Sequence, residues 1–508
     1  GVGGAYFAIK ASTGFANDLR KDLFNKIQKF SFKNIDQYNT GSLVTRLTND
    51  ITQIQNMIQM MLRMALRAPG MLIGALIMAF ALNWRLAMTI FCVIPFLSAA
   101  IYFIMKIGLP RFANMQKKLD ALNTTTQENL TNIRVVKSFV RERYEEEKFK
   151  KANMDLKEST LRAMNVVIFT IPVMTLAMNI TTLAVVWFGG NQVIVGSMLP
   201  GVLTAFVNYV IQILMSLIMV SMIILNSSRT IASARRINEV LDTNIDLTDE
   251  NAQYKDLTVQ QGKIEFRNVY FKYYKNNEKW VLENINLVIN PGETVGIIGS
   301  TGCGKTSLVQ LIPRLYDVDE GEVLVDDVNV KDYSLKNLRN GVGIVLQKNV
   351  LFSGTIMENL KWGDENASDE EVYKYAESAQ AHGFITSFEA GYNTELGQGG
   401  VNVSGGQKQR LCIARALLKK PKILILDDST SAVDTATERR IRENFNNMLK
   451  GTTKIIIAQR ISSVINADKI VVLDDGKIVG MGSHEELLKN CETYSEIYYS
   501  QMDKKVTA

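Results

Sequence analysis

Cysteine and histidine are scarce in this chain of 508 residues, which has four of the former and two of the latter. The cysteines lie far apart in the sequence without a CxxC or other paired spacing, which argues against a disulfide framework and against a cysteine metal site. They are Cys92, Cys303, Cys412 and Cys491. Such sparse cysteine fits a reducing compartment for any soluble part of the chain. The hydrophobic fraction of 47% excludes disorder and collagen-like repeats.

Charge is also missing from long parts of the first half. No Asp, Glu, Lys or Arg occurs from Ala163 to Ser228, a run long enough for two membrane-spanning helices of about 20 residues each. We expect these helices near 164–188 and 202–226, with a break between Gly189 and Gly201, where turn residues cluster. Residues 68–84 and 86–105 are also uncharged and are separated only by Arg85. They predict a second helical hairpin with a very short turn.

The two halves of the chain differ in net charge. Residues 1–250 have 26 basic and 17 acidic side chains, a net of +9, and residues 251–508 have 31 and 34, a net of −3. Basic residues concentrate in 106–162, whereas the 189–201 loop has none. The positive-inside rule therefore places the 106–162 connection, the N-terminal segment and the C-terminal half in the cytoplasm. Basic residues so close to apolar helices indicate topology rather than a nucleic-acid partner.

The 106–162 connection has apolar residues at heptad-like spacing and no Pro or Gly after Pro110. We therefore expect helix to continue from the membrane far into the cytoplasm. The same pattern predicts helix over 15–65, broken near Asn39-Thr40-Gly41. Pro95 and Pro172 fall inside predicted membrane helices, where kinks are tolerated. Residues 1–9 are apolar but too few to span a membrane, so the chain is expected to begin inside a helix.

A new domain is predicted from about residue 263, where the pattern changes to the alternation typical of strands. Its most specific motif is Gly299-Ser-Thr-Gly-Cys-Gly-Lys-Thr306, between an apolar strand at 293–298 and an apolar-periodic helix reaching Leu315. In this context GxxxxGK[ST] is typical of a phosphate-binding loop, because its glycines let backbone N–H groups surround phosphates. Lys305 is expected to contact the β- and γ-phosphates of ATP, and Thr306 to hold Mg²⁺.

Two further motifs support nucleotide binding. Residues 421–427 form an apolar run that ends in Asp427, as does the buried strand whose carboxylate positions Mg²⁺ in P-loop proteins. Between this strand and the phosphate loop lies Val403-Ser-Gly-Gly-Gln407, followed by a basic helical stretch. Ser-Gly-Gly alone is common in turns, but between these two motifs it is a strong signal.

Together these motifs resemble those of ATP-binding-cassette (ABC) exporters, whose half-transporters fuse six membrane helices to one cassette. The resemblance extends from about Ser12 to Gln501. It implies a polytopic α-helical membrane domain fused to an α/β P-loop NTPase cassette with a helical subdomain. The implied domains are a membrane domain at 1–245, a linker at 246–262 and a nucleotide-binding domain at 263–508. The first membrane helix and most of the second would lie outside this sequence, and 34–43 and 131–137 correspond to the two coupling helices that dock on the cassettes.

The resemblance also implies roles for individual residues. Tyr273 corresponds to the A-loop aromatic that stacks on adenine, and Gln347 to the Q-loop, which senses Mg²⁺ and faces the membrane domain. Residues 394–400 resemble the X-loop and 431–434 the D-loop, and 403–407 matches the signature except that Val replaces the usual Leu. The implied nucleotide-binding residues are Tyr273, Gly299, Ser300, Thr301, Gly302, Cys303, Gly304, Lys305, Thr306, Ser307, Ser404, Gly405, Gly406 and Gln407. The implied Mg²⁺ ligands are Thr306, Gln347 and Asp427, and the catalytic positions are Gln347, Asp428 and Gln459.

Two catalytic positions depart from the family pattern. The residue after Asp427 is normally Glu, which polarises the attacking water, but here it is Asp428, one methylene shorter. The switch histidine is replaced by Gln459, which can hydrogen-bond a γ-phosphate but cannot carry a proton near pH 7. Neither His382 nor His484 is placed to substitute for it. Because phosphoryl transfer depends on positioning, the two changes predict a degenerate site that binds ATP and hydrolyses it weakly.

The resemblance thus implies one subunit of a heterodimeric, multidrug-type ATP-driven exporter in the cytoplasmic (inner) membrane, with its cassette in the cytoplasm. Its partner would be a second half-transporter with the consensus Glu and His, whose site Ser404 and Gly406 would complete. ATP and Mg²⁺ are the implied cofactors, and a hydrophobic or amphipathic small molecule is the implied substrate. The alternatives are a homodimeric exporter with two slow sites, and a regulatory or channel-like protein that binds ATP without pumping.

Overall fold

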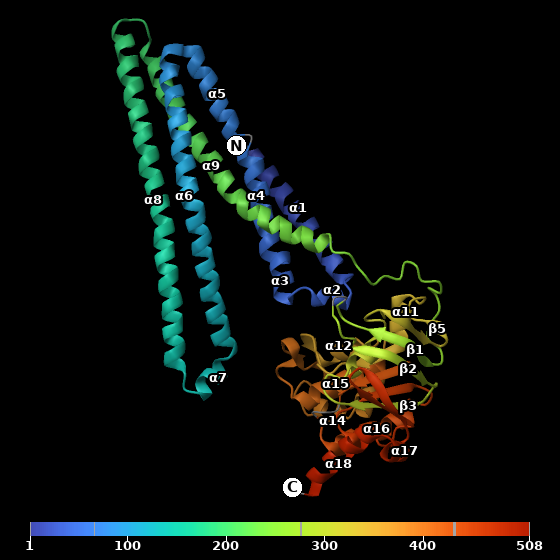
Figure 1. Ribbon diagram of the computed structural model, residues 1–508. Helices are drawn as coiled ribbons and strands as arrows, with labels where there is room; N and C mark the ends of the chain where they lie inside the picture. The colour runs from blue at the N-terminus through green and yellow to red at the C-terminus, as the bar shows by residue number, and fades with distance from the viewer. Residues whose placement is uncertain (1, 66, 275–276, 430–432, 507–508) are drawn as a thin grey trace. The chain divides into compact units, whose positions relative to one another are not determined.

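The computed structural model describes residues 2–65, 67–274, 277–429 and 433–506. The chain divides into two compact units, one made of the residues up to Gln28 together with 40–242, and the other of 29–39 together with 243–508. Each unit is drawn in Figure 1 with its helices and strands labelled. A short piece of the N-terminal half thus belongs to the second unit.

The described residues of the first unit form helices joined by short turns. The bounds are α1 Val2–Gln28, α3 Thr40–Thr45, α4 Ile51–Met60, α5 Arg67–Leu82, α6 Trp84–Thr131, α7 Ile133–Ser138, α8 Glu142–Ile194 and α9 Pro200–Leu241, with π-helical turns η1 Arg46–Asp50 and η2 Met61–Ala65. Asn83 caps α6, since its side-chain oxygen accepts hydrogen bonds from the backbone N–H groups of Arg85 and Leu86 at 3.1 and 3.2 Å. This cap explains how one residue suffices to turn the chain between α5 and α6.

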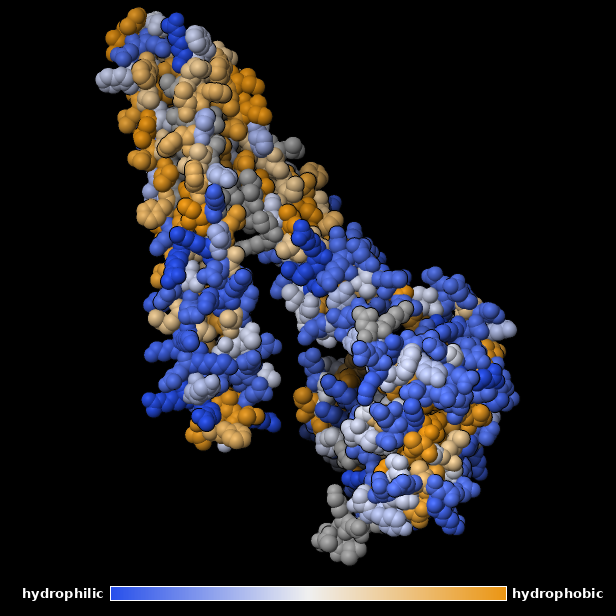
Figure 2. Space-filling model, viewed as in Figure 1, coloured by the Kyte–Doolittle hydropathy of each residue, from blue (hydrophilic) through white to orange (hydrophobic). Residues whose placement is uncertain are grey.

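The predicted extension of helix beyond the apolar segments is present in α6 and α8, which run side by side (Figure 1). Between them, Lys118 pairs with Asp155 at 2.6 Å and Lys148 with Glu128 at 3.1 Å. Pro95 and Pro172 lie inside α6 and α8, as expected. Figure 2 shows mainly apolar side chains over one half of this helical unit and mainly hydrophilic side chains over the other half, with some hydrophilic side chains at the tip of the first and an apolar patch at the tip of the second.

Two helical stretches among the described residues are long and apolar enough to cross a membrane, Thr40–Leu82 and Pro200–Val220. They overlap the predicted spans at 68–84 and 202–226. The other two predicted spans, 86–105 and 164–188, lie inside α6 and α8. Several of their side chains are outside the described set.

The prediction of helix boundaries was wrong at two places. The break expected near 39–41 is present at residues 37–39, between α2, Phe32–Asp36, and α3, which starts at Thr40, but α1 already ends at Gln28, so the chain has a second break at 29–31 that was not predicted. A capping box between Ser31 and Asn34 starts α2. Helix α8 also continues through Gly189 to Ile194. A Cβ on Gly189 would lie 2.4 Å from Leu203 Cδ1, so this glycine allows close helix packing rather than a turn.

The second unit contains two main sheets. An antiparallel sheet has the order β2-β1-β4-β5. A six-stranded sheet has the order β12-β11-β3-β10-β9-β6 and is parallel except at β12. The strands are β1 Ile264–Phe271, β2 Leu282–Ile289, β3 Thr294–Gly299, β4 Glu320–Val325, β5 Val328–Asn329, β6 Val342–Val345, β7 Gly354–Thr355, β8 Glu395–Leu396, β9 Ile423–Asp427, β10 Thr453–Ile457, β11 Lys469–Asp474 and β12 Lys477–Gly482. Every residue of β9 is buried, as expected for a central parallel strand.

Helices cover this sheet, and an apolar cluster joins their side chains, such as Leu411 and Leu417, to strand residues such as Leu424 of β9. Their bounds are α10 Lys305–Gln310, α11 Leu335–Gly341, α12 Ile356–Lys361, α13 Asp369–Ser378, α14 His382–Thr386, α15 Gly405–Leu418, α16 Thr435–Met448, α17 His484–Asn490 and α18 Glu492–Val506, with 3-10 turns η3 Gly391–Asn393, η4 Gln398–Gly400 and η5 Ile461–Ser463. The helix predicted to reach Leu315 was therefore too long. Pro313, which has no N–H and clashes with the carbonyl four residues earlier, explains the early end of α10.

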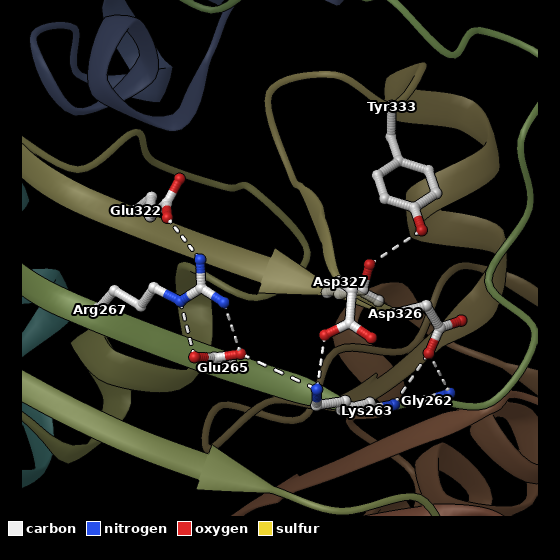
Figure 3. A network of polar contacts seen from close by, with 9 residues as sticks. Gly262, Lys263, Glu265, Arg267, Glu322, Asp326, Asp327 and Tyr333 are labelled. Carbon is white, nitrogen blue, oxygen red and sulfur yellow. Dashed lines mark hydrogen bonds and ion pairs between the residues drawn. The ribbon is translucent and has the colours of Figure 1, made fainter.

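A network of polar contacts fastens the start of the cassette to the turn between β4 and β5 (Figure 3). The Asp326 carboxylate accepts hydrogen bonds from the backbone N–H groups of four consecutive residues, 260–263, at 2.6 to 3.0 Å. Asp326 and Asp327 have φ values of 49° and 65°, the left-handed conformation of a two-residue hairpin turn. Beside them, Arg267 pairs with Glu265 and Glu322. These contacts hold the start of β1 in its pairing with β4.

Candidate nucleotide-binding site

The carboxyl ends of three neighbouring parallel strands bring the predicted site together. The phosphate loop follows β3. Asp427 is the last residue of β9 and Asp428 comes directly after it, and Gln459 comes two residues after the end of β10. Register places Ile457 beside both Ile297 and Asp427. In parallel sheets, loops at the carboxyl edge form the binding crevice, so motifs more than 100 residues apart meet.

The phosphate loop has the backbone that its glycines predict. Gly302 and Gly304 have φ values of 87° and 99°, which residues with a Cβ rarely adopt. A Cβ on Gly299 would lie 2.0 Å from the Leu473 carbonyl oxygen. The Lys305 ammonium donates hydrogen bonds to the carbonyl oxygens of Gly299 and Ser300 at 2.8 and 2.7 Å. The lysine therefore folds over the loop in which Ser300, Thr301 and Cys303 also lie.

Two predicted Mg²⁺ ligands are in contact. The Thr306 hydroxyl lies 3.1 and 2.9 Å from the two carboxylate oxygens of Asp427. Asp427 is only 2% exposed, and burial raises the pKa of its carboxyl; the Thr306 hydrogen bond and the Lys305 charge oppose this rise, while the Asp428 charge adds to it. Hydroxyl and carboxylate oxygens are the hard ligands that Mg²⁺ prefers. A cation here would also offset the cost of the buried negative charge.

The two positions that depart from the family pattern hydrogen-bond to each other. The Gln459 amide Nε2 donates to Asp428 Oδ2 at 2.9 Å. Burial raises the pKa of the Asp428 carboxyl, while a hydrogen bond from the Gln347 side chain, the charges of Lys305 and Arg460, and the Gln459 amide lower it. Asp428 has a φ of 46°, a left-handed conformation that Asp tolerates better than most residues. All three predicted catalytic positions thus meet at one carboxylate.

The predicted adenine platform is linked to the phosphate loop. The Tyr273 hydroxyl lies 2.7 Å from the hydroxyl of Ser307, the residue that follows Thr306. Burial raises the pKa of the Tyr273 phenol, which keeps it neutral. The Tyr273 ring meets Phe271 and Tyr316 edge-on, at centroid distances of 4.9 and 5.1 Å. Tyr316 was not foreseen, because no local pattern distinguishes it.

The signature residues form a separate part of the cassette surface. Ser404 caps α15 through a capping box with Gln407, in which the Gln407 N–H donates to Ser404 Oγ at 3.3 Å and the Ser404 N–H donates to Gln407 Oε1 at 2.8 Å. Ser404 and Gly405 are exposed, and Gly406 is partly exposed. In the described part of the cassette, no hydrogen bond or ion pair joins this motif to the phosphate loop. Of the D-loop, Ser431 and Ala432 lie outside the described residues.

A docking contact between segment 29–39 and the cassette adjoins the adenine platform. The Tyr316 hydroxyl donates a hydrogen bond to Asp36 of α2 at 2.8 Å, and its ring lies against Phe32 with centroids 6.1 Å apart. Ser31 donates to Asp246 at 2.5 Å. Tyr316 therefore contacts both Tyr273 and α2.

Comparisons with known proteins agree over nearly the whole chain. Residues 1–217 match the family described as ABC transporter transmembrane region, and residues 282–431 match the family described as ABC transporter. A protein of Bacillus subtilis (strain 168), the uncharacterized ABC transporter ATP-binding protein YfiB, is 42% identical over 505 residues, which cover 99% of this chain and 87% of that protein. The chain belongs to the ABC transporter family. The predicted resemblance to ABC exporter half-transporters is confirmed.

Other relatives of this ABC transporter point the same way. An ATP-dependent lipid A-core flippase of Syntrophus aciditrophicus (strain SB) is 36% identical over 487 residues, covering 95% of this chain and 80% of the flippase. The structure of a bacterial Atm1-family ABC exporter with ATP bound is similar with a TM-score of 0.83 and 27% identity, covering 97% of this chain and 86% of that one. The predicted fold class, a helical transmembrane domain fused to an ABC cassette, is confirmed. The family is membrane-embedded, multi-pass and ATP-binding.

Proposed function

We propose that this ABC transporter chain is one subunit of a heterodimeric exporter. Its own site binds ATP and hydrolyses it slowly, and its signature motif completes the competent site of the partner. The observation that carries the proposal is the 2.9 Å hydrogen bond between the Gln459 amide and Asp428. Asp428 stands where the family has the glutamate that polarises the attacking water, and here it accepts a hydrogen bond from the neutral amide of Gln459. This amide does not gain or lose a proton near pH 7, which supports slow hydrolysis at this site.

ATP binding itself is supported by an intact set of contacts. The glycines of 299–304 present backbone N–H groups for the phosphates, and Lys305 is free to exchange its two carbonyl contacts for phosphate oxygens. Thr306, Asp427 and Gln347 would hold Mg²⁺, which neutralises charge on the β- and γ-phosphates when bound. The rise in the pKa of Asp427 on burial fits a carboxylate that a cation stabilises.

The partner and the substrate follow from the chemistry of the two surfaces. The exposed N-terminus of α15, with Ser404 and Gly405, is available to a nucleotide held by a second half-transporter that has Glu and His at the two positions. The apolar helices of the first unit suit a hydrophobic or amphipathic molecule, and the flippases among the relatives favour a lipid-like or multidrug-type cargo. The basic 106–162 segment supports placement in the cytoplasmic membrane with the cassette in the cytoplasm.

The decisive experiment measures ATP hydrolysis by the full chain purified alone and by its complex with the half-transporter encoded beside it. The chain alone should be nearly inactive, and the complex active. Asp428→Glu combined with Gln459→His should raise hydrolysis at this site by on the order of 10²-fold, because catalysis is that sensitive to shifts of about 1 Å. Asp327→Glu is the matched control, since Asp327 is also left-handed, with a φ of 65°, but lies in the β4–β5 turn.

Three results would contradict the proposal. Robust hydrolysis by the unaltered chain alone would identify a homodimeric exporter. A complex that binds ATP without transporting any lipid or drug substrate would favour a regulatory or channel-like protein. An unchanged rate in the double variant, with the Asp327→Glu control also unchanged, would mean that Asp428 and Gln459 do not limit hydrolysis.

A further inference from the structure

The backbone that carries Gln459 is bound on one side by a single side chain from the C-terminal helix. Gln501 Nε2 donates a hydrogen bond to the carbonyl oxygen of Gln459 at 2.8 Å, and the Ile461 N–H donates to Gln501 Oε1 at 2.9 Å. One amide thus satisfies an acceptor and a donor on either side of Arg460, as a neighbouring strand would. The loop between β10 and η5 is thereby closed against α18.

Helix α18 is itself anchored. Tyr494, Ile497, Tyr498 and Gln501 follow the i, i+3, i+4, i+7 spacing that puts them on one helix face. Tyr494 is fully buried, and Ile497 and Tyr498 pack against the same apolar cluster, which includes Ile461 of the loop. The Tyr494 hydroxyl also lies 2.7 Å from His484 Nδ1. Gln501 therefore reaches the loop from a fixed support.

The opposite side of the loop is bound by α16. Arg442 donates to the Ser462 carbonyl oxygen at 3.0 Å, and the Ser463 hydroxyl donates to Glu438 at 2.9 Å. Residues 459–463 are thus held between two helices. Of the contacts that these two helices make with the described loop, the one from Gln501 reaches the backbone of residue 459 itself. Before it in the chain, the Ala458 N–H donates to the Ile297 carbonyl oxygen of the sheet at 3.2 Å, so Gln501 fixes the side of residue 459 that leads away from the sheet.

We propose that Gln501 is a positioning residue for the switch position, Gln459. By fixing the carbonyl of Gln459, it aims the Gln459 amide at the carboxyl edge of the sheet, where that amide meets Asp428 at 2.9 Å. When ATP is bound, the same backbone placement brings the Gln459 amide within reach of the γ-phosphate. This last step rests on the proposed function, in which Gln459 takes the place of the switch histidine.

The test compares Gln501→Ala, Gln501→Glu and Gln459→Ala in the full chain. Glutamate can still accept from the Ile461 N–H but cannot donate to the Gln459 carbonyl, so it separates the two halves of the contact. Ser500→Ala is the matched control, because the Ser500 hydroxyl donates to the Ile497 carbonyl at 3.0 Å within α18 itself. Two quantities are measured: hydrogen–deuterium exchange of the Ile461 amide, and the ratio of the dissociation constants for ADP and ATP in the presence of Mg²⁺.

In Gln501→Ala the Ile461 amide should exchange about fivefold faster, the change expected from losing one hydrogen bond. Its preference for ATP over ADP should fall by about the same factor and approach that of Gln459→Ala, with ADP affinity unchanged. Gln501→Glu should keep the Ile461 amide protected but lose the preference for ATP. Ser500→Ala should match the unaltered chain in both measurements, and a similar melting temperature for all variants excludes general loss of structure.

Unaltered exchange in Gln501→Ala would overturn the inference, and so would a preference for ATP that falls in Gln459→Ala but not in Gln501→Ala. A third set of results would refute the role of Gln459 in the proposed function but leave the inference about Gln501 standing. If exchange accelerates in Gln501→Ala but Gln459→Ala itself leaves the preference for ATP intact, Gln501 still fixes the loop, and the role proposed for Gln459 is wrong.

Discussion

At the scale of the residue, two adjacent carboxylates, Asp427 and Asp428, are held at the end of one buried strand, and burial raises the pKa of both. A carboxyl whose pKa is higher in the folded than in the unfolded chain binds more protons when folded. The free energy of unfolding therefore falls as the pH rises from the unfolded value, 3.8 for Asp427, through the folded one. In the nucleotide-free chain, the buried negative charge of these carboxylates therefore lowers the free energy of unfolding at neutral pH.

Asp427→Asn should therefore raise the melting temperature of the nucleotide-free chain at pH 7.5, because the amide can still accept from Thr306 but has no charge to bury. The gain should shrink as the pH is lowered toward 3.8, and Mg²⁺-ATP should stabilise the variant far less than the unaltered chain. Asp434→Asn is the control and should lower the melting temperature at pH 7.5, since the hydrogen bond from the Thr437 backbone N–H favours the charged carboxylate and lowers the pKa of Asp434. A lower melting temperature for Asp427→Asn at pH 7.5 would refute the argument.

The sequence predicted some residues of the site and missed others for a definable reason. Lys305, Thr306 and Asp427 belong to contiguous motifs whose strand and helix context is visible in the sequence. Gln501 contacts a residue 42 positions away, and Tyr316 contacts Asp36, 280 positions away. Such contacts depend on how helices pack, which local patterns do not encode. The pairing of Gln459 with Asp428 was likewise visible only once β9 and β10 were side by side.

At the scale of the element, the sequence predicted which segments are helical better than where each helix ends. The run of Gly189 and Gly190 was interpreted as the start of a turn, but α8 passes through both, because Gly189 accommodates Leu203 and Leu86 from neighbouring helices. In membrane helices, small residues such as glycine let neighbouring helices approach closely. The break predicted near 39–41 is present at 37–39, whereas the one before the capping box at Ser31 was not predicted.

The two glycines allow a direct comparison. Gly189→Val should destabilise the helical unit by about 1–3 kcal/mol, as overpacking typically does, because its Cβ would lie 2.4 Å from Leu203 Cδ1 and 3.3 Å from Leu86 Cδ1. Gly190→Val should cost little, since nothing lies within 4 Å of a Cβ there. The measurement is thermal unfolding in detergent at matched protein concentration. Equal effects of the two substitutions would show that helix propensity, not packing, decides the outcome.

At the scale of the whole molecule, ATP use has to reach the helices that handle the cargo. Tyr316 touches both the predicted adenine platform, Tyr273, and α2, through Asp36. Helix α2 leads within four residues to α3 at Thr40. The path thus runs from Tyr273 through Tyr316 to Asp36 by side-chain contacts, and from α2 to α3 along the chain. All of these residues are among those that the structure describes.

Tyr316→Phe should keep the ring contact with Tyr273 but lose the hydrogen bond to Asp36. We expect ATP affinity to change less than twofold, and substrate moved per ATP hydrolysed to fall severalfold, when the complex is assayed in vesicles. Tyr333→Phe is the matched control, because the Tyr333 hydroxyl donates to the Val325 carbonyl oxygen at 3.0 Å inside the antiparallel sheet. Its loss should lower thermal stability without changing the transport yield. Equal transport yields for the two variants would contradict the path.

The length of α8 has a mechanical consequence. Its 53 residues amount to about 80 Å at the rise of an α-helix. A tilt of about 5° at one end of such a rod displaces the other by about 7 Å over that length. A small angular change near α7 therefore becomes a displacement of several ångströms at the other end of α8.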